Sequence, residues 1–297
     1  MLYRQNLLLG AVLMIAAEFL FASMGAAVKA AAAELPNEVI VFVRNVLGLL
    51  ILLPLLARGG LPRLRTQVFH LHLLRAVAGL AAMYCFFYAL AHLHLAEGML
   101  LKMTAPIFMP IVAWLWLTER LPAYATLAIP LGFAGVMLVL RPEGDFNWIA
   151  VIGVLGGALA AIAQTSLRRL GRSEPTVRVV FYFSLLAALF SALPMVWAWQ
   201  TPTPALWVSL AVVALTGTLG QLLLTRGYAV AATGRLAPFI YFSVVFGALY
   251  GYWLWDERLH LSFVLGATLI AIGGVLAVRA RERTTPAEPN AVRSSAE

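Results

Sequence analysis

Cysteine and charge are both scarce in this chain of 297 residues. Cys85 is the only cysteine, so the sequence provides neither a disulfide framework nor a cysteine-based metal site. Asp, Glu, Lys and Arg together make up 11% of the residues, whereas ordinary globular domains carry about 25%. Such a low charge content excludes a soluble domain of this size.

Catalytic motifs are missing as well. The sequence contains no His-Glu-x-x-His helix, no Gly-x-Ser-x-Gly elbow, no Asp-rich diphosphate motif, no pair of intramembrane aspartates and no Walker pattern. The histidine pairs His70/His72 and His92/His94 have i, i+2 spacing, which does not place two imidazoles on one helical face. We therefore predict a protein that is not an enzyme and that holds no metal and no cofactor.

Apolar residues dominate instead, at 62% of the chain. They gather in windows of about 20 residues, the length at which a helix crosses a bilayer. The windows are 6–31, 36–57, 72–93, 96–118, 122–141, 147–168, 175–199, 204–226, 235–255 and 259–279. This pattern predicts an all-α membrane protein with ten transmembrane helices.

The positive charges indicate how these helices are oriented. The net charge is +8, but the basic residues lie in short loops, as topology determinants do, so no nucleic-acid partner is expected. Sixteen Lys and Arg residues fall on one side, and only Lys29, Arg141 and Arg258 fall on the other. The bias predicts that both termini are cytoplasmic. Residues 281–297 have no apolar period and are predicted to form a disordered cytoplasmic tail.

The two halves of the sequence also resemble each other. A shift of 140 residues superposes Lys29 on Arg169, Glu34 on Glu174, Pro54 on Pro194 and Tyr88 on Tyr228; a shift of 138 superposes 119–121 on 257–259, both Glu-Arg-Leu. Each half holds five spans, an odd number, so the second half enters the membrane upside down. We predict two inverted five-helix repeats, 1–144 and 145–280, around a central cavity, which is an architecture of secondary transporters.

Glu18 lies at the centre of the first apolar window. The window is long enough to place this carboxylate ~18 Å from either end, too deep to reach water. An acid at that depth costs several kcal/mol and normally faces a cavity, a partner or a substrate path. Its counterpart in the second half is Ala158, so the repeat itself does not require an acid there. We interpret Glu18 as part of a transport pathway, with a hydrogen-bonded packing role as the alternative.

Other polar residues inside the windows are weaker candidates. Tyr84 and Tyr88 share a helical face, where they either line a polar cavity or pack in the core. Arg44 and Lys102 lie ~9–10 Å from the ends of their windows, so they either attract a substrate carboxylate or snorkel. The predicted substrate-binding set is Glu18, Tyr84, Tyr88, Lys102, Thr104, Gln164, Gln221, Tyr241 and Ser243, with Arg44 as a gating residue on the periplasmic side.

Prolines are expected to break two of the spans. Pro106 lies near the middle of the fourth window, and Pro238 lies upstream of Tyr241 and Ser243 in the ninth. A proline has no backbone donor, so it frees a carbonyl toward the interior. Broken helices at matched depth in the two halves point to the binding region. The Glu-Arg pairs at 119–120 and 257–258 are interpreted as hinge or capping pairs.

A family resemblance agrees with this interpretation. The string Phe-Ala-Ser-Met-Gly-Ala-Ala-Val-Lys at 21–29, Arg44, Pro106 and the two Glu-Arg-Leu endings resemble the EamA branch of the drug/metabolite transporter superfamily. The resemblance covers residues 5–280 and is closest to aromatic amino acid exporters of the YddG type. It implies that spans 1–4 and 6–9 enclose the cavity while spans 5 and 10 lie outside. It also implies a bacterial inner-membrane exporter of small metabolites.

The predicted function is the export of amino acids or similar small metabolites by alternating access. The partners expected are a small-molecule substrate and membrane lipid, with the chain acting as a monomer or a homodimer. Proton-coupled efflux of cationic drugs is an alternative in which Glu18 binds proton and cation in turn. An intramembrane enzyme, a lipid-handling protein and a passive scaffold are further alternatives.

Overall fold

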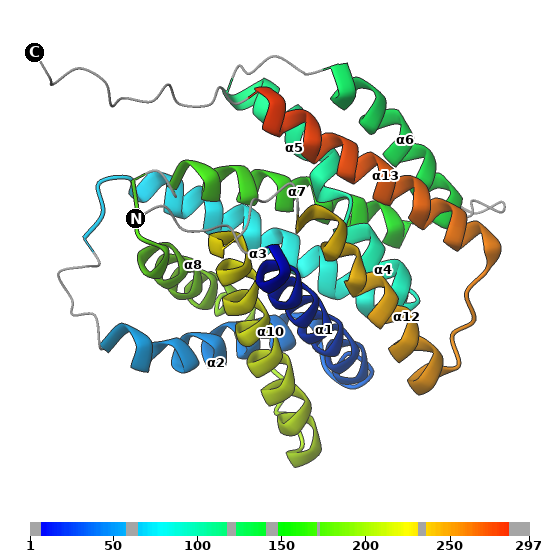
Figure 1. The fold of residues 1–297 in the computed structure, drawn as a ribbon. Helices are drawn as coiled ribbons and strands as arrows, with labels where there is room; N and C mark the ends of the chain where they lie inside the picture. Colours follow the sequence, from blue (N-terminus) through cyan, green and yellow to red (C-terminus); the bar gives the residue numbers. More distant parts are fainter. Residues whose placement is uncertain are drawn as a thin grey trace, which may run out of the picture.

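Helices make up the described part of the chain, and that part contains no strand (Figure 1). The computed structural model describes residues 7–57, 65–117, 123–140, 148–170, 173–230 and 236–284. The helices are α1 (Leu7–Ala31), α2 (Asn37–Ala57), α3 (Phe69–His92), α4 (Leu95–Lys102), α5 (Ala105–Leu117), α6 (Ala123–Leu140), α7 (Trp148–Leu170), α8 (Thr176–Ser191), α9 (Met195–Ala198), α10 (Pro204–Val230), the 3-10 helix η2 (Ala237–Tyr241), α12 (Phe242–Trp255) and α13 (Leu261–Thr284). The prediction of an all-α protein is confirmed.

Five of these helices are long and apolar enough to cross a membrane by themselves: α1, α2, α3, α7 and α10. Shorter apolar helices lie at 129–138, 178–191, 239–255 and 261–273. The remaining predicted span, the fourth, is divided between α4 and α5. A chain with this many apolar helices is a multi-pass membrane protein.

The predicted start of the tail was too early. Helix α13 continues through residues 281–284 and ends at Thr284. The sequence there is Arg-Glu-Arg-Thr, in which Arg and Glu are good helix formers. The helix therefore extends beyond its apolar part.

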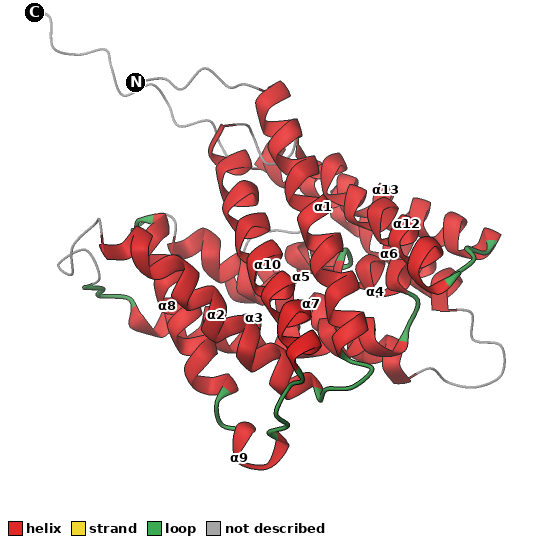
Figure 2. Cartoon of the chain, turned by 90° about the horizontal axis from the view of Figure 1, so that it is seen from below, coloured by secondary structure: helices red, strands yellow, loops and turns green. Residues whose placement is uncertain are grey.

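The helices pack as a central group between two outer pairs (Figures 1 and 2). In the centre, α1 packs along α10 and α3 packs along α7. At one edge α2 packs against α8, and at the opposite edge α6 packs against α13. The fifth and tenth predicted spans, α6 and α13, are thus an outer pair, as expected.

Two helices are interrupted where the sequence predicted it. After Lys102, α4 ends at Met103, and Thr104 Oγ1 donates to the Leu101 carbonyl at 2.6 Å before α5 begins. In the second half the 3-10 helix η2 precedes α12, and Ser243 lies in the first turn of α12. Both irregular segments lie in helices that broken transporter folds use to hold ligands.

Glu174, in the loop between α7 and α8, anchors the start of α8. It accepts hydrogen bonds from Thr66 Oγ1 at 2.7 Å and from Nη1 of Arg178. Burial by itself would raise the pKa of Glu174, but these hydrogen bonds and the Arg178 charge lower it below its ordinary value. A carboxylate with a lowered folded-state pKa contributes stability above its unfolded pKa, and that stability is lost as the pH falls through the folded pKa.

Glu174→Gln is therefore expected to lower the melting temperature at pH 7 and to leave it almost unchanged at pH values below the folded-state pKa. The measurement is the thermal unfolding of purified protein in detergent across that pH range. Glu34→Gln is the matched control, since a shift of 140 residues superposes Glu34 on Glu174 in the sequence. An equal loss at both pH values would mean that the Glu174 charge does not stabilise the fold.

Candidate functional site

Glu18 is buried inside the bundle on α1. Its exposed fraction is 3%, and its Oε2 atom has no hydrogen-bond partner among the described residues. A buried acceptor without a partner costs free energy that a ligand donor recovers on binding. The geometry therefore leaves one carboxylate oxygen available for a ligand.

Lys102 lies against α1 beside Phe21, one helical turn beyond Glu18. Its Nζ atom lies 4.4 Å from the ring centroid of Phe21 and 5.5 Å from that of Phe86. Aromatic faces attract a cation, so the two rings hold the ammonium group in place within the bundle. The role of Lys102 in substrate binding stays a prediction.

Two helix ends add their dipoles to this pair. Lys102 is the last residue of α4, where the partial negative charge of a helix C-terminus favours a cation. Ser243 lies beside the Glu18 carboxylate in the first turn of α12, where the partial positive charge favours an anion. Its hydroxyl is also 3.0 Å from the Ile240 carbonyl oxygen. The end of α4 and the start of α12, one from each half of the chain, thus lie close together near Glu18.

Glu18, Lys102, Ser243, Phe21 and Phe86 form what we call the central site. It offers one anion, one cation, a hydroxyl and two aromatic faces. A zwitterion complements this arrangement, with its amine toward Glu18 and its carboxylate toward Lys102. The rings provide an apolar surface beside the charges.

Two further predicted residues lie on the same helices but engage other groups. Thr104 is buried, and a Cβ atom on Gly157 would overlap its Oγ1, so Thr104 faces α7. The Tyr84 hydroxyl is buried without a partner among the described residues, while the Tyr84 carbonyl accepts from Asn37 at the start of α2. Tyr84 is thus on the α2 side of α3.

Tyr88 and Tyr241 of the predicted substrate-binding set contact other groups than the central site. The ring of Tyr88 stacks on His92 at the end of α3, with centroids 4.2 Å apart. The Tyr241 hydroxyl donates to the Ile270 carbonyl of α13 at 3.2 Å, which directs it toward the outer helix pair. The glutamines Gln164 and Gln221 are exposed and half-buried, respectively. Phe21 and Phe86 supply the aromatic surface instead.

Arg44 lies on α2 beside α10. It donates to Asn45 Oδ1 at 2.9 Å, and its Nε atom is buried without a partner among the described residues. Its guanidinium is about 3.6 Å from the place where a Cβ of Gly217 would stand. Arg44 is therefore an interior cation separate from the central site.

Sequence reasoning missed the two phenylalanines. Phe21 follows Glu18 by three residues, so helical spacing alone places them on one face, and this signal was available. Phe86 has no comparable signal, because its approach to Lys102 depends on how α3 packs beside α4. One capping pair, Glu119-Arg120, lies outside the described residues.

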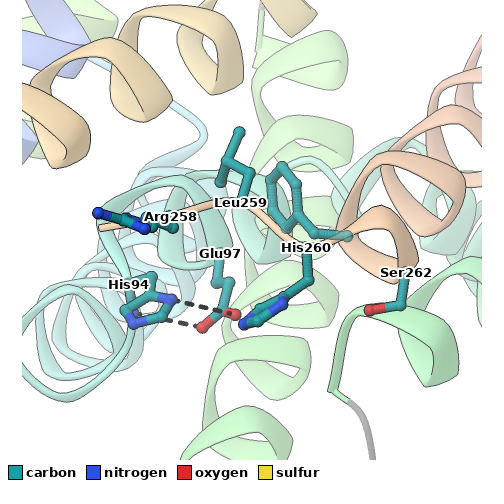
Figure 3. A pocket seen from close by; sticks show the side chains of 7 residues that line it. His94, Glu97, Arg258, Leu259, His260 and Ser262 are labelled. Carbon is teal, nitrogen blue, oxygen red and sulfur yellow. Dashed lines mark hydrogen bonds and ion pairs between the residues drawn. The ribbon is translucent and has the colours of Figure 1, made fainter. Parts of the chain in front are cut away.

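A small polar pocket lies at the turn after α12 (Figure 3). Its lining residues are His94, Glu97, Arg258, Leu259, His260, Ser262 and Phe263. The Glu97 carboxylate in it already has partners, accepting from the His94 backbone and lying 3.6 Å from Nδ1 of the same histidine. Since its acid is engaged, this pocket is a weaker ligand site than the central site.

Comparisons with known proteins agree on the kind of protein. The EamA-like transporter family matches the chain twice, over residues 8–141 and 147–279. The pseudopaline exporter of Pseudomonas aeruginosa is 31% identical over 278 residues, covering 92% of this chain and 97% of that protein. A riboflavin transporter of Brucella anthropi is 30% identical over 80% of this chain and 86% of its own length.

Two further proteins are more distantly similar to this chain: an uptake transporter and a protein of solved structure. An S-adenosylmethionine uptake transporter of Rickettsia bellii is 24% identical over 78% of this chain and 80% of that protein. A solved crystal structure superposes with a TM-score of 0.64 at 19% identity, covering 93% of this chain and 99% of that one. At that identity the superposition is evidence for the fold alone.

Proposed function

Because this chain belongs to the EamA-like transporter family, we propose that it is an inner-membrane secondary transporter that exports amino acids, aromatic ones included, or similar small metabolites by alternating access. Both termini are cytoplasmic in this proposal, on the strength of the sixteen-to-three bias in Lys and Arg. The single observation that carries it is the central site, where Glu18 is buried on α1 and Lys102 Nζ lies 4.4 Å from the ring of Phe21, one turn away.

The proposal includes two inverted five-helix repeats. The two family matches lie on either side of residue 144, which supports a division there. Equivalent contacts also recur in the two halves. The packing of α1 along α10 corresponds to that of α7 along α3, and α2 with α10 corresponds to α8 with α3. Lys29 lies 5.6 Å from the Trp255 ring, and its counterpart Arg169 lies 5.3 Å from the Trp116 ring.

The substrate class follows from the charges of the central site. Glu18 suits an ammonium group and Lys102 suits a carboxylate, and one amino acid carries both. Phe21 and Phe86 suit an apolar or aromatic side chain. The relatives named for pseudopaline export and riboflavin transport support a cargo that is small and organic, with the amino acid assignment resting on the site itself.

Efflux of cationic drugs is less well supported by the same geometry. A lipophilic cation at Glu18 would lie beside Lys102, and like charges at short range inside a bundle repel strongly. A zwitterion avoids this repulsion because it presents its carboxylate to the lysine.

Counterflow in proteoliposomes tests the proposal. Purified protein is reconstituted, loaded with one unlabelled amino acid at a time, and offered the same labelled amino acid outside, with and without an imposed pH gradient. We expect accumulation of at least one aromatic or apolar amino acid. If no amino acid is exchanged while lipophilic cations are, the drug-efflux alternative replaces the proposal.

A further inference from the structure

Lys29 and Glu257 form a buried ion pair between the two halves of the chain. Nζ of Lys29 lies 2.7 Å from Oε1 of Glu257, and the two side chains are exposed by only 14% and 7%. Lys29 is in the last turn of α1, and Glu257 lies just beyond the end of α12. The pair is about 16 Å along α1 from Glu18, so it lies to one side of the central site.

Both side chains of this pair also form hydrogen bonds to the turn between α3 and α4. Lys29 Nζ also donates to the Leu93 carbonyl at 2.6 Å, and the Leu95 backbone N–H donates to Oε2 of Glu257 at 2.7 Å. The Trp255 ring lies beside the ammonium group. A buried ion pair is stable only when its other polar atoms are satisfied in this way. Three separate segments, the ends of α1 and α12 and the α3–α4 turn, are thus held at one point.

Local backbone geometry directs Glu257 into this position. Asp256 ends α12 with a φ of 50°, the left-handed conformation that Asp tolerates better than most residues. The chain then turns back so that the Glu257 carboxylate lies over Gly251, where an added Cβ would overlap its Oε2 atom. Gly251 is therefore a requirement of the ion pair.

The helices between this pair and the central site leave no gap. Met99 of α4 is fully buried between α1 and α12. A Cβ on Gly25 would overlap its Cε, and a Cβ on Gly247 would be 3.0 Å from its Cγ. The bundle is therefore closely packed beside the Lys29 end.

We propose that Lys29, Glu257 and the Leu93–Leu95 turn form the gate that closes the extracytoplasmic end of the transport path, and that this gate is closed in this structure. The proposal rests on the proposed transport function and orientation. The ion pair must break each time the path opens outward, because it joins the helix ends that have to separate. Arg169 and Trp116 occupy the corresponding place at the cytoplasmic end of the other repeat.

Glu257→Gln is the direct test, because glutamine can still accept from the Leu95 N–H but leaves Lys29 without an anion. A reporter cysteine replaces Phe86 in a Cys85→Ser background, and a membrane-impermeant maleimide is applied from outside the cell. We expect labelling to be faster by at least about tenfold, since removing one member of a buried ion pair shifts an equilibrium by more than that factor. Glu34→Gln, which removes an exposed carboxylate in the turn after α1, is the matched control and is expected to leave the rate unchanged.

Two further variants separate gating from misfolding. Gly251→Ala keeps both charges but displaces the Glu257 carboxylate, and should accelerate labelling as Glu257→Gln does; Gly227→Ala, whose nearest contact would be 3.6 Å, should not. Cysteines at Ala96 and Gly247 should form a disulfide on oxidation, and adding Glu257→Gln should slow that reaction. Labelling and crosslinking that are unchanged by Glu257→Gln would overturn the gate. Neither measurement needs a cargo, so a failed counterflow experiment would leave their outcome interpretable.

Discussion

Glu18→Gln is expected to abolish most of the transport activity while the protein still inserts. Glutamine preserves the shape of the side chain but removes the charge that we assign to substrate ammonium binding. Losing a charged partner inside a buried site costs about 1.5–3 kcal/mol, so the counterflow rate should fall by at least about tenfold. The measurement is the initial rate per reconstituted protein.

The control for this experiment is Glu34→Gln. Glu34 is also a carboxylate of the first half, but it is exposed in the turn after α1. Its replacement should leave the counterflow rate close to that of the unmodified protein. A normal rate for Glu18→Gln would remove Glu18 from the mechanism.

Gly135→Ala is expected to produce the largest loss of stability. A Cβ at this position of α6 would lie 2.7 Å from the Gly266 carbonyl oxygen and 2.9 Å from the Ile270 nitrogen. Both are backbone atoms of α13 and cannot rotate away, so the two helices would have to separate. Overpacking of this kind costs about 1–3 kcal/mol. The measurement is the melting temperature in detergent, which should fall clearly.

Gly227→Ala tests whether this loss comes from the α6–α13 contact. Its added methyl group would meet its nearest neighbour, the Gly10 carbonyl oxygen, at 3.6 Å, an ordinary contact. Alanine is also the better helix former by about 1 kcal/mol. The melting temperature should therefore stay the same or rise. If Gly135→Ala melts like Gly227→Ala, then α6 and α13 are not closely packed in the folded protein.

The depth of a residue in the membrane could be predicted from the chain, but its neighbours could not. For Lys102, the distance from the end of a span allows either snorkelling or substrate binding, and only the structure places its ammonium group beside Phe21 and Phe86. Tyr241 belongs to the same predicted site, yet its hydroxyl donates to Ile270 on α13. Residues at equal depth can face opposite sides of a bundle.

The ion pair of the proposed gate could not be predicted from the sequence either. Lys29 was counted as one of three basic residues on the less positive side, and Glu257 was interpreted as part of a capping pair. Glu257 does cap a helix, but it is α4 of the other half, through the Leu95 N–H. No local pattern connects two residues so far apart in the sequence.

Hydropathy and charge by themselves determined that this chain is an all-helical membrane protein and that Glu18 lies deep within it, and the positions of two prolines determined where its helices are irregular. These properties depend on the sequence of one helix and on its contact with lipid or water, which act locally along the chain. Only the tertiary structure decided that Lys102 and Ser243 meet Glu18, and that Lys29 meets Glu257. These contacts depend on the rotation and packing of several helices at once. In lipid, the close fit between helices determines which helices become neighbours.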